Sequence, residues 1–131
     1  MTPEETPSAG GQPLAAWAEA AVRATQRGLP EALRLAASRV PVAYESLPPA
    51  ELLADGIEPD TLGLFVGSTR EELEAGVPQL PSKIALYLEN LWEFAGGDRP
   101  LFQEEVRITY LHELGHYLGL DEEDLADRGL E

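Results

Sequence analysis

The chain of 131 residues has no cysteine, only two histidines, and a single methionine at position 1. Without thiols it can form neither disulfides nor cysteine–metal bonds, so any bound metal would be held by imidazole and carboxylate groups. No apolar run approaches the roughly 20 residues that a membrane-spanning helix needs. These absences exclude a disulfide-stabilised scaffold and a membrane span.

Basic residues are also scarce. The chain has 9 lysines and arginines against 24 aspartates and glutamates, which gives a formal net charge of −15. Such a surface repels phosphate backbones and anionic lipids, so we expect neither nucleic acid nor a membrane as a partner. Residues 1–6 are acidic where a signal peptide would be basic, and we therefore expect a cytoplasmic protein.

The length suits one domain and is too short for two independent cores. Residues 1–13 are rich in proline, glycine, serine, threonine and glutamate and lack apolar periodicity, which is typical of a flexible tail. The sequence therefore predicts an N-terminal tail over residues 1–13 and a single domain over residues 14–131.

Two helices are predicted at the start of this domain. Apolar residues recur at helical spacing over residues 14–28, and a second short helix is predicted over residues 31–38, directly after a proline. We expect core positions in these helices at Trp17, Leu33 and Leu35.

The middle of the chain alternates short strands and helices. Segments rich in β-branched, aliphatic and aromatic residues predict strands at residues 40–45, 61–66 and 83–88. Pro41 favours an edge position for the first strand or a place at the start of that strand. Short helices are predicted at residues 48–54 and 89–95, and residues 68–82 predict a loop with at most one helical turn. One longer helix is the alternative for residues 83–95.

The strongest helical pattern covers residues 100–118. One broad surface is apolar and comprises Val106, Tyr110, Leu111, Leu114, Tyr117 and Leu118. A separate face aligns Glu105, Thr109, His112 and His116. The helix is therefore predicted to pack on one side and to present polar groups on another.

Residues 112–122 read HExxHxxGxxE and contain both histidines of the chain. On a helix, His112 and His116 lie on one face with about 5–6 Å between their Cβ atoms, so both rings can reach one ion. Glu113 lies close enough to serve as a general base for a metal-activated water. The motif predicts a zinc site; the alternative is an amphipathic helix with two ordinary surface histidines.

Gly119 decides where a third ligand can come from. A continuous helix would carry Glu122 roughly 15 Å beyond His112, too far to share a metal. A glycine at the helix end can adopt a left-handed conformation and turn the chain back toward His116. Glu122 and Asp121 are then the candidates for the third ligand. If Gly119 only ends the helix, that ligand must come from upstream.

The segment 105–125 resembles the signature of the minimal zincin family, which comprises small bacterial zincin-like proteins, and residues 51–65 are similar to the middle region of that family. The resemblance covers roughly residues 29–125. It implies an α+β fold in which a small mixed sheet of about three strands packs against helices. It also implies that the HExxH helix lies near the C-terminus.

The same resemblance implies roles for individual residues. The family motif is HExxHxxGxxD, which makes His112 and His116 zinc ligands, Glu113 the base and Glu122 the third ligand. The chain departs from the motif here, because glutamate occupies the position of the family's aspartate, and the neighbouring Asp121 is the alternative ligand. No methionine follows Met1, so the Met-turn of metzincins is absent.

Three functional hypotheses follow. The first is a zinc-dependent metallopeptidase that cleaves a peptide or protein substrate, with Tyr110 or Tyr117 as candidates for an additional electrophile and with substrate added as a strand near residues 61–66. The second is a non-catalytic zinc-binding module with a structural or regulatory role. The third is a metal-free interaction domain.

Overall fold

The computed structural model describes residues 12–76, 81–120 and Asp124. Within these residues the helices are α1 (Leu14–Arg27), α2 (Glu31–Ala37), α3 (Ala50–Ala54), α4 (Arg70–Glu74), α5 (Leu88–Phe94) and α6 (Arg99–Leu118). The strands are β1 (Val42–Glu45), β2 (Gly63–Val66) and β3 (Lys83–Tyr87). The predicted α+β fold is confirmed. The predicted N-terminal tail falls almost entirely outside the described residues.

The sheet has the order β1-β3-β2, with β1 parallel and β2 antiparallel to β3. Ala85 in the central strand pairs with Ala43 on one side and with Leu64 on the other. From Ile84 to Tyr87 the central strand is buried, whereas β1 and β2 are half-buried edges. The edge position predicted for the first strand is therefore confirmed, and β2 forms the second edge.

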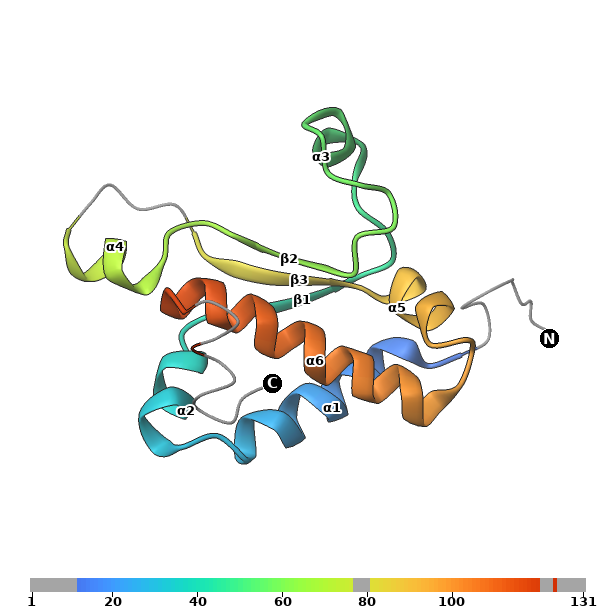
Figure 1. Ribbon diagram of the computed structural model, residues 1–131, viewed down its shortest axis with the longest axis horizontal. Helices are drawn as coiled ribbons and strands as arrows, with labels where there is room; N and C mark the ends of the chain where they lie inside the picture. Colours follow the sequence, from blue (N-terminus) through green and yellow to red (C-terminus); the bar gives the residue numbers. More distant parts are fainter. Residues whose placement is uncertain (1–11, 77–80, 121–123, 125–131) are drawn as a thin grey trace.

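Helices α1 and α6 lie side by side beneath the sheet, while α3 lies at the end of a loop that extends from its other side (Figure 1). All six residues of the predicted apolar surface of α6 are buried. On α1 the buried residues are Leu14, Ala18 and Val22, spaced four apart as a packed helix face requires. Trp17, Trp92 and Phe102 form an aromatic cluster with ring centroids 5.7–6.5 Å apart.

Several sequence predictions differ from the structure. Leu35 was predicted to be a core residue, and this was wrong, because its side chain is 60% exposed. The seven-residue α2 buries Leu33, Ala36 and Ala37, which share one helical face, and Leu35 lies on the opposite face. The two edge strands also begin two residues later than predicted, at Val42 and Gly63.

The segment predicted as a loop contains the short helix α4. Thr69 caps it by accepting a hydrogen bond from the Glu72 amide, while the Glu72 carboxylate accepts one from the Thr69 amide. Residues 83–94 form a strand followed by a helix, and not the single longer helix considered as the alternative. Among the described helices, none combines the length and apolar character needed to cross a bilayer.

Gly63 allows β2 to lie directly on α6. A Cβ atom placed at this glycine would lie 2.5 Å from Thr109 Cγ2 and 3.2 Å from the Ala85 carbonyl oxygen. Real Cβ atoms essentially never come within 3.0 Å of another atom, so with any other residue at this position either Thr109 or the strand would have to shift. The distance between β2 and α6 is therefore set by a missing side chain.

We predict that Gly63→Ala lowers the free energy of unfolding by about 1–3 kcal/mol, because the added methyl group overpacks the contact with Thr109. Gly28→Ala is the control, since φ is −86° there and the nearest atom to an added Cβ is 3.6 Å away. Urea denaturation of both variants tests this prediction. Equal stability of the two variants would show that β2 does not depend on the close contact.

Candidate metal centre

The metal-binding motif lies in the last two turns of α6, the longest helix described. Asp98 caps its start by accepting a hydrogen bond from the Leu101 amide at 2.9 Å. Gly119 ends it with φ 77°, in the left-handed region that the sequence predicted. The Leu120 amide donates to the Gly115 carbonyl oxygen at 2.8 Å, so the chain turns away from the helix axis at this point.

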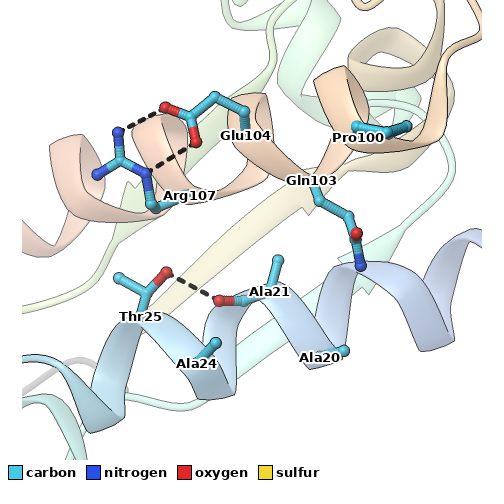
Figure 2. Close-up of a pocket in the computed structure, with 8 residues that line it drawn as sticks. All are labelled: Ala20, Ala21, Ala24, Thr25, Pro100, Gln103, Glu104 and Arg107. Carbon is cyan, nitrogen blue, oxygen red and sulfur yellow. Dashed lines mark hydrogen bonds and ion pairs between the residues drawn. The ribbon is translucent and has the colours of Figure 1, made fainter.

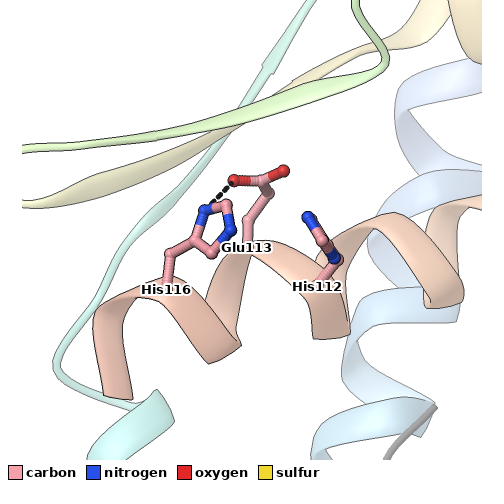
Figure 3. A group of neighbouring side chains, drawn as sticks. All are labelled: His112, Glu113 and His116. Carbon is pink, nitrogen blue, oxygen red and sulfur yellow. Dashed lines mark ion pairs between the residues drawn. The ribbon is translucent and has the colours of Figure 1, made fainter. Parts of the chain in front are cut away.

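The side chains of His112, Glu113 and His116 converge beside β2 (Figure 3). Each offers a nitrogen or oxygen atom, and these atoms all lie within 4.8 Å of one another. The two imidazole ring centroids are 4.7 Å apart, and His116 Nδ1 lies 3.2 Å from Glu113 Oε1. The structure thus brings together the three residues that the motif predicted, while their roles as ligands and base stay predictions.

Glu113 is held differently from His116. It is only 6% exposed, and its Oε1 accepts a hydrogen bond of 3.0 Å from the Phe65 amide in β2. The side chain of His116, in contrast, is 51% exposed. A buried carboxylate needs a hydrogen-bond donor, and the outer edge of β2 supplies it. The carboxylate is therefore anchored to the protein, while the imidazole of His116 faces solvent.

Phe65 is the residue of this centre that the sequence did not reveal. Its backbone amide is the group that donates to Glu113, so no residue-type pattern marks it. Its ring packs against Tyr117 with centroids 5.9 Å apart, which fixes the strand over the last turns of α6. The only signal in the sequence was the predicted strand over residues 61–66, whose second edge can hydrogen-bond outside the sheet.

Both tyrosines considered as additional electrophiles are core residues. Tyr110 is fully buried, and its hydroxyl accepts a hydrogen bond from Gln26 Nε2 on α1 at 3.0 Å. Burial raises the pKa of the Tyr110 phenol, which the hydrogen bond from Gln26 partly offsets. Tyr117 is 2% exposed and packs on Phe65. Tyr110 therefore serves packing between α1 and α6, and Tyr117 serves packing against β2.

The donor set fits zinc. Zinc binds imidazole nitrogen and carboxylate oxygen at about 2.0–2.2 Å, so the ligand atoms around one ion lie roughly 3–4 Å apart. The atoms observed here are separated by at most 4.8 Å, and rotation of the exposed His116 ring can close the difference. The candidate third ligands, Glu122 and Asp121, lie outside the described residues.

A separate hollow of about 470 Å³ lies between α1 and α6 (Figure 2). Alanines of α1 form one wall, and Gln103, Glu104 and Arg107 of α6 form the other. The Arg107 guanidinium donates two hydrogen bonds to the Glu104 carboxylate, at 3.1 and 2.6 Å. None of the three converging residues lines this hollow, so it is not part of the candidate metal centre.

Comparison with known protein families links this group of side chains to a family of metal-dependent enzymes. The sequence profile of a family described as zincin-like metallopeptidase matches residues 37–130, which is more than half of the chain. The match includes the three strands and the whole of α6. Such a family implies a metal ion, typically zinc, and the His112, Glu113 and His116 group could bind it. Among curated proteins, nothing matches the chain.

We predict that Phe65→Pro is less stable than Phe65→Ala by about 1–3 kcal/mol, because only the proline variant lacks the amide that donates to Glu113. Both variants lack the aromatic ring, so the comparison isolates the hydrogen bond. Phe65 lies opposite Ile84 with its amide directed away from β3, so proline breaks no bond of the sheet.

The same pair of variants in a Glu113→Ala background provides the control. Without the carboxylate the two variants should unfold at the same denaturant concentration. A gap of the same size in both backgrounds would mean that proline acts through the strand backbone alone.

Proposed function

The chain belongs to the zincin-like metallopeptidase family, and we propose that it is a zinc-dependent peptidase with Glu113 as its general base. The observation that carries the proposal is the convergence of His112, Glu113 and His116 beside the edge strand β2. Two imidazoles suit zinc, and a carboxylate that is fixed next to them suits proton transfer. In this proposal His112 and His116 are ligands, with Glu122 as the third ligand and Asp121 as its alternative.

Zinc, when bound, supplies a Lewis acid that makes water more acidic and polarises a peptide carbonyl. Glu113 takes a proton from the attacking water while the oxygen of that water bonds to the carbonyl carbon of the peptide. Glu113 then gives that proton to the amide nitrogen as the carbon–nitrogen bond breaks, which yields a carboxylic acid and an amine. The hydrogen bond from the Phe65 amide holds one oxygen of the carboxylate, which keeps the group oriented through both transfers.

The substrate in this proposal is an extended peptide or protein segment that adds to the outer edge of β2. This strand pairs with β3 on one side only, so its other side carries backbone groups that another strand can pair with, apart from the Phe65 amide, which donates to Glu113. The hydrogen bond from the Phe65 amide to Glu113 lies on this outer edge, which supports the proposal. A peptide on the edge would therefore lie close to the proposed metal.

The second candidate function is a zinc-binding module without hydrolytic activity. One observation favours it: the Phe65 amide on the outer edge of β2 already donates to Glu113, so this amide is not free to pair with a substrate strand. A site whose neighbouring strand edge is partly occupied can hold zinc without accepting a peptide. The two functions agree on zinc binding and differ only in hydrolysis.

We predict one zinc per purified chain, measured by elemental analysis, and loss of that zinc in His112→Ala and His116→Ala.

We also predict that wild-type protein hydrolyses members of a peptide library. A chelator should stop this hydrolysis, and Glu113→Gln should stop it while the variant retains zinc. Glu104→Gln is the matched control on the same helix and should leave hydrolysis unchanged. Zinc binding that raises the melting temperature without any hydrolysis would support the non-catalytic module.

The third ligand has its own test. Glu122→Gln is expected to lower zinc affinity at least tenfold, because a neutral amide replaces a coordinating carboxylate, whereas Asp121→Asn should leave the affinity nearly unchanged. Competition with a chromophoric chelator measures both affinities. The opposite ranking of the two variants would assign the ligand to Asp121.

A further inference from the structure

Two adjoining hollows border α5. This helix lies at the end of the sheet where β2 begins (Figure 1). The first, of about 240 Å³, is lined by Asp60, Leu62, Asn90, Glu93 and Phe94. The second, of about 430 Å³, shares Asn90 and Glu93 and continues to Leu47, Glu89 and Trp92. We call the two hollows together the α5 furrow.

The furrow combines negative charge with apolar walls. Its carboxylates belong to Asp60, Glu89 and Glu93, and no lysine or arginine lines it. In the part of the chain that the structure describes, neither Asp60 nor Glu93 forms an ion pair. Phe94 is 64% exposed. A lysine or arginine side chain suits this surface, since its aliphatic stem can cover the apolar wall while its charged head meets the carboxylates.

Hydrogen bonds fix the wall of the furrow nearest to β2. The Asn90 amide donates to the Pro59 and Thr61 carbonyl oxygens, at 2.8 and 2.9 Å. These bonds attach the segment before β2 to α5. The first hollow is therefore a built feature of the fold, and a ligand would not have to order it on binding.

The furrow lies at a defined distance from the candidate metal centre. Leu62 lines it, and Phe65, three residues further along the chain, donates to Glu113. At about 3.3 Å per residue, three residues of strand span roughly 10 Å. A peptide that lies along the outer edge of β2 with its reacting bond near Glu113 would thus reach the furrow about three residues away.

Two exposed apolar residues of α6 lie on the face of the helix that carries His112. Leu101 and Ile108 are 56% and 40% exposed, and helical spacing places both on the face that carries His112. Two other exposed large hydrophobic residues, Leu47 and Phe94, line the furrow itself. Exposed apolar side chains in a hollow are typical of a binding surface.

We propose that the α5 furrow is a specificity subsite that takes a lysine or arginine side chain about three residues from the bond that is cleaved. The position relative to that bond rests on the proposed peptidase function, whereas the preference for a basic side chain rests on the furrow itself. A substrate strand antiparallel to β2 runs from the metal centre toward the furrow. The basic residue then lies on the C-terminal side of the cleaved bond.

The test uses Glu113→Gln protein loaded with zinc and two fluorescein-labelled decapeptides that differ only in one residue, arginine or glutamate. Fluorescence anisotropy measures binding, and we expect the arginine peptide to bind about tenfold more tightly. Binding should also shift the side-chain amide signals of Asn90, the only asparagine of the chain, in an NMR spectrum.

Charge reversal within and outside the furrow distinguishes a local subsite from general attraction to an acidic protein. Glu93→Lys should remove the preference for arginine, whereas Glu104→Lys, which changes the net charge equally on another surface, should preserve it. Equal loss in both variants, or no preference in the parent protein, would overturn the proposal.

Hydrolysis by the protein with an intact Glu113 separates the two proposals. Cleavage of both peptides with equal KM would support the peptidase and overturn the subsite. Tight binding of the arginine peptide that depends on Glu93, with no cleavage of any peptide, would support the furrow as a binding site and overturn the peptidase. A KM about tenfold lower for the arginine peptide, with similar kcat, supports both.

Discussion

The hydrogen bond between the Phe65 amide and the Glu113 carboxylate is the contact on which the rest of the site depends. A buried carboxylate is costly unless donors satisfy it, and the outer amide of an edge strand needs an acceptor. The amide thus gives the carboxylate its donor, and the carboxylate gives the amide its acceptor. The bond also places the open edge of β2 beside the two histidines, and the absence of a side chain at Gly63 allows the strand to lie that close to α6. One contact therefore aligns the proposed base, the proposed ligands and the proposed substrate edge.

Glu113 and His116 differ in burial, and this difference suits the different roles proposed for them. Glu113 is almost fully buried and fixed, whereas the His116 side chain is half exposed and can adjust its ring to an ion. In the described part of the chain, the imidazole of His116 is thus open to solvent. The carboxylate, in contrast, has little freedom to leave its position. A general base benefits from such fixed orientation, because proton transfer requires a short and well-directed approach.

The sequence predicted α6, its buried face, the left-handed Gly119 and the grouping of both histidines with Glu113, because a 3.6-residue pattern repeated over a long helix is unambiguous. Short elements were less predictable. The five-residue α4 rests on the capping pair Thr69 and Glu72, and Leu35 belongs to a helix too short for its apolar face to be assigned reliably. The role of Phe65 was beyond sequence patterns, since its backbone amide is the donor and any residue except proline could supply it.

Helix α1 supports α6, although α1 lies outside the region that matches the family, which begins at residue 37. Two long-range hydrogen bonds tie it to α6: Gln26 donates to the Tyr110 hydroxyl, and Gln103 donates to the Trp17 carbonyl oxygen. Since a three-stranded sheet covers only one side of α6, another side of the helix needs a second apolar surface to bury Tyr110 and its neighbours. α1, which lies beside α6, supplies that surface. The helix that carries the HExxH motif therefore packs against β2, whose Phe65 amide holds Glu113, and against α1.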